Sequence, residues 1–351
     1  MALRLALGPA ALFVLGMAYA WPLAFVAAVL SILLLQAPAP PSLRAGGALV
    51  ATAAGLMLAA WVVFTVLQWF PALYMVAVAL WVVGAFNLSV NGRSPLLVVL
   101  SLFAGLLIPL LVKTSPQLAL LVAAWLPLNL AIAVFATQAM FVVLPASQRT
   151  RAKAAGTASG QPAFDPERRL VRMSLVTLPY VLVFFLTDGG AVLTLLIVAL
   201  LTQQLAASTL AGPKVAGSML VSNVIGGLAA LVCYELVVMA PFFPFMALVT
   251  LLACLVLGTW SASGRQDAAL AGSAMSTMLI LFGGAMAPFA EDTSVAMGTR
   301  LLQVGMALAW VLSAFVVVDV LLPERSRALP NWRNSLRRGR GRAARAPGPP
   351  G

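Results

Sequence analysis

The sequence predicts an all-α polytopic membrane protein, and its composition and its apolar runs are the observations that predict it. Of the 351 residues, 62% are hydrophobic and 9% are charged, whereas a soluble domain carries about 25% charged residues. Apolar runs of about 16–27 residues recur along the chain, and a helix needs about 20 residues to cross the hydrocarbon layer. The runs do not alternate in polarity as barrel strands do, so we expect helices.

The apolar runs divide into twelve predicted helical segments, six in each half of the chain. Trp21-Pro22, Phe70-Pro71 and Asn91-Gly92 place turn signals between neighbouring segments. The first two segments are short for a full crossing, at about 16 residues each. They form either two spans or a re-entrant hairpin, which leaves ten to twelve crossings. The segments are 3–19, 21–36, 46–68, 72–90, 95–112, 118–144, 172–187, 190–206, 216–239, 244–262, 269–288 and 299–322.

The segments group into two membrane repeats, a linker and a tail. Residues 1–145 form the first repeat and residues 171–323 the second. Residues 146–170, between them, are a polar linker rich in Ala, Gly, Arg and Pro. Residues 324–351 are rich in Arg, Pro and Gly and have almost nothing to bury, so we expect a disordered tail.

The distribution of basic residues predicts that both termini face the cytoplasm. With the N-terminus inside, the outward connections carry only Lys113 and Arg300, and the other 19 of the 21 basic residues lie on the inner side. Asp188, Glu291 and Asp292 then fall on the outer side. Basic loops remain in the cytoplasm, so this asymmetry sets the orientation.

The two halves share residues in a common order, which predicts an internal duplication. Arg4 opens the first segment, and Arg172 opens the seventh 168 residues later. Each repeat has an even number of segments, so the two copies should face the same way and be related by an axis near the membrane normal. Such an arrangement places a pathway between the halves. The other matched pairs are Gln36 with Gln204, Arg44-x-x-Gly47-Ala48 with Lys214-x-x-Gly217-Ser218, Pro71 with Pro244, Gly84 with Gly258, Gly105 with Gly284, Pro109 with Pro288 and Pro145 with Pro323.

Several kinds of chemistry are excluded by the residues present. The chain has no His, which excludes imidazole relays and His metal sites. Cys233 and Cys254 lie inside apolar runs without metal-ligand spacing and are expected to be small buried side chains. No phosphate-binding G-x-x-x-x-G-K-[ST] motif occurs. We therefore predict no enzyme activity and no metal or other cofactor.

Ionisable and polar residues within the apolar segments are the candidate transport-pathway residues, since their burial in lipid is costly. Glu235 lies about four residues from the outer end of its segment and is the carboxylate that we would choose for proton coupling. Asp188 and Asp319 are more simply interpreted as interfacial carboxylates. Asn129, two residues after Pro127, and Asn223 lie deeper in their segments, and Gln138 follows in the same segment as Asn129. Hydrogen bonding between helices is the alternative role for these amides.

Four basic residues form two repeat-related pairs at the cytoplasmic mouths: Arg4 with Arg172, and Arg44 with Lys214. They either anchor the topology or form a vestibule that attracts an anionic substrate. The Arg-rich tail is expected to contact anionic lipid, and no nucleic-acid partner is expected. The sequence leaves the oligomeric state open, a homo-oligomer included.

The chain resembles the fusaric-acid-resistance and aromatic-acid-exporter superfamily, and within it the short two-repeat branch of unknown function. The likeness rests on Arg4 opening an apolar hairpin broken at Trp21-Pro22, and on the entry of the third segment, Arg44-Ala45-Gly46-Gly47-Ala48, repeated as Lys214-Val215-Ala216-Gly217-Ser218. It covers residues 3–322. Where the family commonly has Thr after the motif glycine, this chain has Ala48 and Ser218. The resemblance implies a bacterial inner-membrane, proton-driven exporter of small aromatic or other organic acids that works with a membrane-fusion-type periplasmic adaptor.

Two other classes compete with that expectation. A major-facilitator-like carrier also has twelve segments in two halves, but its Gly-x-x-x-Asp-[Arg/Lys]-x-Gly loop is absent from residues 39–47. A non-transporting scaffold subunit of an envelope complex would account for the low polarity of the membrane segments. Substrate, direction of transport, coupling ion and the need for an adaptor are not decided by the sequence.

Overall fold

The computed structural model describes residues 2–37, 39–145, 166–186, 198, 212–263 and 267–286, together with 306–307, 309–311 and 313–318. These residues form helices joined by short turns, with no strand among them. Six of the helices are long and apolar enough to cross a membrane. The outer face of one of them carries Leu58, Val62 and Val66, all exposed, as a lipid-facing surface requires. The predicted class, an all-α polytopic membrane protein, is confirmed.

Four of the described helices of the first half begin at a serine cap, at a proline in the first turn, or at both. Ser94 and Ser115 each accept a hydrogen bond from the backbone N–H three residues on, at 3.3 and 3.4 Å, and each is followed by proline at the first helical position. Ser42 caps its helix in the same way. The helices are α1 (Ala2–Ala18), α2 (Ala24–Leu35), α3 (Leu43–Leu67), α4 (Pro71–Val90), α5 (Pro95–Thr114) and α6 (Pro116–Val143).

The second half is described in part. The predicted segment 190–206 is outside the described residues except for residue 198, and the last segment is described only within 306–318. Residues 146–165 and the tail also lie outside. One helix begins at Pro166, inside the predicted linker, because Pro166 and Glu167 are favourable first-turn residues. The helices are α8 (Pro166–Leu186), α10 (Gly212–Met239), α11 (Phe243–Ala262) and α12 (Ala268–Ala285).

Helices α1 and α2 form a short hairpin with a tightly built tip. Ala20 and Leu23 have positive φ angles of 47° and 58°, and the backbone N–H of Trp21 donates to the Gly16 carbonyl at 3.1 Å. This turn delays the start of α2 to Ala24, three residues later than predicted. The 12 residues of α2 span about 18 Å, which is well short of the hydrocarbon thickness.

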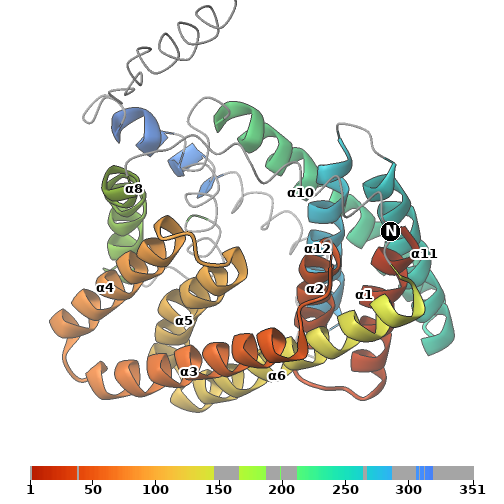
Figure 1. Ribbon diagram of the computed structural model, residues 1–351, viewed down its shortest axis with the longest axis horizontal. Helices are drawn as coiled ribbons and strands as arrows, with labels where there is room; N and C mark the ends of the chain where they lie inside the picture. The colour runs from red at the N-terminus through yellow and green to blue at the C-terminus, as the bar shows by residue number, and fades with distance from the viewer. Residues whose placement is uncertain are drawn as a thin grey trace, which may run out of the picture.

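Helices α3 and α6 run side by side along one edge of the molecule (Figure 1). The hairpin α1–α2 lies with α11 and α12 on one side, and α4 and α5 lie with α8 on the other. Thus α1 packs on α11 of the second half, and α8 packs on α4 of the first. The ring of Phe185 in α8 lies 6.2 Å from that of Tyr74 in α4, and Lys113 donates to the Phe185 carbonyl at 3.4 Å.

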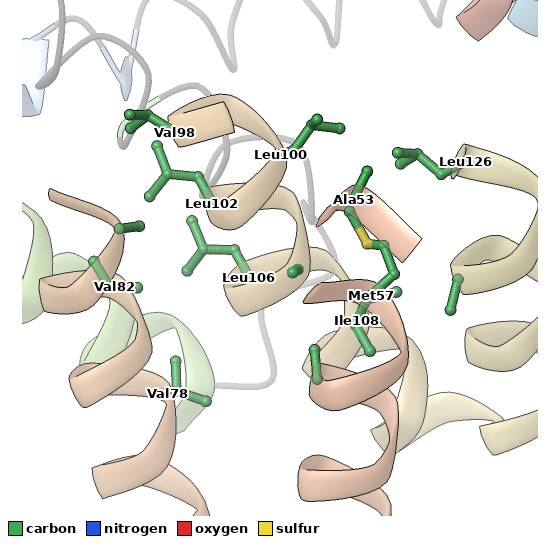
Figure 2. Close-up of a cluster of buried hydrophobic side chains, with 14 of the residues drawn as sticks. Ala53, Met57, Val78, Val82, Val98, Leu100, Leu102, Leu106, Ile108 and Leu126 are labelled. Carbon is green, nitrogen blue, oxygen red and sulfur yellow. The ribbon is translucent and has the colours of Figure 1, made fainter. Parts of the chain in front are cut away.

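Two apolar clusters support these two sides. One joins α3, α4, α5 and α6: Leu102 and Leu106 of α5 point toward α4, which carries Val78 and Val82, and Ile108 of α5 lies beside Met57 of α3 (Figure 2). The other joins the hairpin to α10, α11 and α12, with Phe13 of α1 stacked on Phe282 of α12 at 5.5 Å. The hairpin is therefore buried against helices of both halves.

Candidate functional site

Asn129 lies at the junction between α6 and the hairpin tip and is fully buried. Its side-chain amide donates to the carbonyl of Pro22 at 3.3 Å and to that of Trp125 at 2.9 Å. Its Oδ1 is buried and accepts no hydrogen bond from the described residues. Pro127, two residues earlier in α6, frees a backbone carbonyl in the same turn region.

Gln138 ties α6 to the connection between α2 and α3. Its Nε2 donates to the Pro41 carbonyl at 2.8 Å. The partner is backbone, so this amide fixes the path of the chain that leaves the hairpin.

Asn223 belongs to a polar seam where α10 packs on α12. Its Oδ1 accepts a hydrogen bond from the Thr277 hydroxyl at 3.0 Å, and the hydroxyls of Ser222 and Ser273 meet at 3.1 Å. The helices approach closely here because Gly226 faces Ala274: a Cβ on Gly226 would collide with the Ala274 carbonyl oxygen. Gly226 therefore permits close packing of α10 on α12.

Glu235 is exposed on α10 and contacts none of the three amides described above. Its neighbours Cys233 and Val237 are buried, whereas Leu236 is exposed. The described structure therefore does not bring together the four pathway candidates. Asn129 and Gln138 hold the hairpin to α6, Asn223 holds α10 to α12, and Glu235 faces outward.

The two arginines that open the predicted repeats are both buried, at 3% exposed for Arg4 and 8% for Arg172. The guanidinium carbon of Arg4 lies over the Phe141 ring of α6, 3.8 Å from its centroid. That of Arg172 lies over the Phe315 ring in the last described helical stretch, at 6.0 Å. Each arginine thus pairs with a phenylalanine from the final segment of its own half.

The other two predicted vestibule residues differ from this pair. Arg44 is exposed at the start of α3. Lys214 lies in α10, but its side chain is outside the described residues, as are Asp188, Glu291, Asp292 and Asp319. A solvent-facing vestibule therefore fits Arg44 and not Arg4.

Sequence reasoning missed Phe141 and Phe315. They are separated by 174 residues, whereas the matched pairs on either side of them, Pro109 with Pro288 and Pro145 with Pro323, are separated by 179 and 178, so the repeat alignment does not pair these two phenylalanines. A phenylalanine in an apolar segment is unremarkable until its arginine partner is placed beside it.

The described residues contain no group of three or more His, Cys, Asp or Glu side chains that could hold a metal ion. Cys233 and Cys254 are buried free thiols.

Compared with known proteins, the chain matches no family model, no curated protein and no solved structure. The residues and their geometry are therefore the basis for assigning a function.

Proposed function

We propose that this multi-pass membrane protein is a proton-driven exporter of small aromatic or other organic acids in a bacterial inner membrane, working with a periplasmic adaptor. The observation that carries the proposal is the hairpin α1–α2. A 12-residue helix too short to cross the bilayer is buried between helices of both halves and is held by Asn129 and Gln138. A re-entrant segment at membrane depth is tolerated only where it is buried in protein or lines a water-filled cavity, as substrate pathways do.

The reciprocal packing of the halves supports a two-repeat carrier. Helix α1 packs on α11, and α8, which opens the second half, packs on α4. In the predicted alignment α1 corresponds to α8 and α4 to α11, so a two-fold axis would exchange the two contacts. A pathway at such an axis would be lined by the first helices of both repeats. The substrate class is taken from the resemblance to aromatic-acid exporters.

A scaffold subunit is the second candidate, and one observation favours it. The amides of Gln138 and Asn223 are both engaged in hydrogen bonds that join parts of the protein. Such bonds stabilise membrane helices by about 0.6 kcal/mol each and need no substrate.

Accumulation of radiolabelled weak acids in cells tests the exporter. We expect lower accumulation of aromatic acids in cells that express the protein with its adaptor, and loss of this difference with a protonophore or with Glu235→Gln. Glu167→Gln, which neutralises an exposed carboxylate at the start of α8, is the matched control and should export normally.

A combined Asn129→Ala, Asn223→Ala and Glu235→Gln variant separates the two candidates. An exporter should lose activity, whereas a scaffold should keep its partner bound in co-purification. Equal accumulation with and without the wild-type protein, adaptor present, would favour the scaffold.

A further inference from the structure

The guanidinium of Arg4 is a buried cation whose donors are incompletely used. Its Nε is buried and has no hydrogen-bond partner among the described residues, and no ion pair to Arg4 is found within them. A guanidinium carries five N–H donors. Burying this charge without an anion costs far more than one aromatic contact returns.

The contact with Phe141 leaves the donors of Arg4 available. The cation lies over the ring, 3.8 Å from the centroid. A guanidinium this close to a ring centroid can lie with its flat face on the ring, and hydrogen bonds to an oxyanion then use its N–H edge. Phe141 therefore orients the guanidinium and leaves its edge to bind two oxygens of one anion.

The position of Arg4 in α1 adds to the attraction for an anion. It lies in the first turn of a helix that begins at Ala2, where backbone N–H groups have no intrahelical partner and the helix dipole is positive. Gly258 of α11 encloses this turn from the other half, since a Cβ added to Gly258 would lie 3.1 Å from the Ala2 carbonyl oxygen and 3.4 Å from the Ala6 nitrogen. The site is thus built from α1, α6 and α11.

The arrangement occurs twice, which argues against a chance burial of Arg4. Arg172 is also buried in the early part of the corresponding helix and also lies over a phenylalanine of the last segment of its half. Topogenic anchoring requires a basic residue near lipid headgroups and not one that is only 3% exposed.

We infer that Arg4, oriented by Phe141, binds an oxyanion, and that this oxyanion is the carboxylate of the exported acid. The second part rests on the proposed function and names Arg4 as the residue that selects acids over neutral analogues. A lipid phosphate offers the same chemistry, so the test must separate a lipid headgroup from a free carboxylate.

The test is isothermal titration calorimetry on the full chain in dodecyl maltoside, without phosphate, using benzoate and its neutral analogue benzamide as probes. We expect benzoate to bind, benzamide not to bind, and Arg4→Gln to weaken benzoate binding by at least about tenfold. Arg93→Gln removes an exposed arginine from the α4–α5 turn and should leave the affinity unchanged. Arg4→Lys keeps the buried charge but loses the planar guanidinium that can bind two oxygens at once. This variant should fold and should bind benzoate several-fold more weakly than wild type.

Three outcomes would overturn the inference. Equal binding of benzoate and benzamide would show that the site does not recognise the carboxylate charge. An equal loss of benzoate affinity in Arg4→Gln and Arg93→Gln would show that the affinity depends on the net charge of the protein and not on Arg4. Arg4-dependent binding of dihexanoyl phosphatidylglycerol without binding of benzoate would assign the site to a lipid headgroup.

Binding and export are separate readouts. Benzoate binding without export by cells would contradict the proposed function alone. Export that persists in Arg4→Gln would contradict this inference alone.

Discussion

The side-chain amide of Asn129 donates to the carbonyl of Pro22 across 3.3 Å and so joins α6 to the hairpin tip. The tip itself contains two left-handed non-glycine residues, Ala20 and Leu23. Because such conformations persist only where surrounding contacts hold them, this hydrogen bond has a larger structural consequence than its energy alone suggests.

Asn129→Ala should lower the free energy of unfolding by about 1–3 kcal/mol, since it removes two hydrogen bonds from a buried site. Thermal unfolding of the purified protein in detergent measures the change. Asn87→Ala, which truncates an exposed amide on α4, should stay within about 0.5 kcal/mol of wild type. Similar losses in both variants would contradict the role of Asn129 at the tip.

Gly226→Ala should destabilise the second half, because its Cβ would lie 2.7 Å from the Cβ of Thr277 and even closer to the Ala274 carbonyl oxygen. Overpacking of this kind costs about 1–3 kcal/mol. Gly217→Ala on the same helix meets nothing within 4 Å and should be neutral or stabilising. The two unfolding midpoints, compared in one detergent, test whether the α10–α12 seam is as close as described.

Cysteines at positions 6 and 258 should form a disulfide in a Cys233→Ser, Cys254→Ser background. The Cβ positions of Ala6 and Gly258 lie 3.5 Å apart, which is within the range of native disulfides. Mild oxidation followed by non-reducing electrophoresis after cleavage between the halves measures the link. The Ala6→Cys, Gly84→Cys pair is the control, because nothing lies within 4 Å of the Gly84 position.

Arg93→Cys and Gln117→Cys, made in that same background, should label from opposite sides of the membrane. Both positions are exposed, Arg93 in the turn before α5 and Gln117 in the first turn of α6, so the single span α5 separates them. With the predicted N-in orientation, a membrane-impermeant maleimide should reach position 117 in intact cells and position 93 only in inverted vesicles. The reverse pattern would overturn the predicted orientation. Labelling of both cysteines from the same side would show that α5 does not cross the membrane.

The helices were predictable from the sequence where local signals act. Pro71 and Pro95 begin α4 and α5 within a residue of the predicted starts, because proline at the first helical turn requires no partner for its nitrogen. The tip between α1 and α2 was not predictable. Ala20 and Leu23 adopt positive φ angles that their side chains ordinarily disfavour, so only tertiary contacts such as the bond from Asn129 explain the turn.

The residues of the candidate site were predictable from the sequence, but their contact partners were not. Asn223 is identifiable as a polar group in an apolar segment, yet its partner Thr277 is 54 residues away and is chosen by helix packing. The sequence alone predicts an anchor or vestibule role for Arg4, because its burial depends on Phe141, over a hundred residues later. The alignment of repeats, by contrast, stays a prediction that the labelling and disulfide experiments can test.

The enclosure of the hairpin by α11 and α12 has a consequence for synthesis of the protein. Residues 2–35 leave the ribosome well before partners such as Gly258 and Gly283, which follow more than 200 residues later. At roughly 5–20 residues per second the delay is on the order of 10–50 s. During that time the hairpin, which carries the buried Arg4, cannot pack against α11 and α12 because they have not been synthesised. The first half therefore should not mature as an independent unit, and an N-terminal fragment should require the insertase machinery or be degraded.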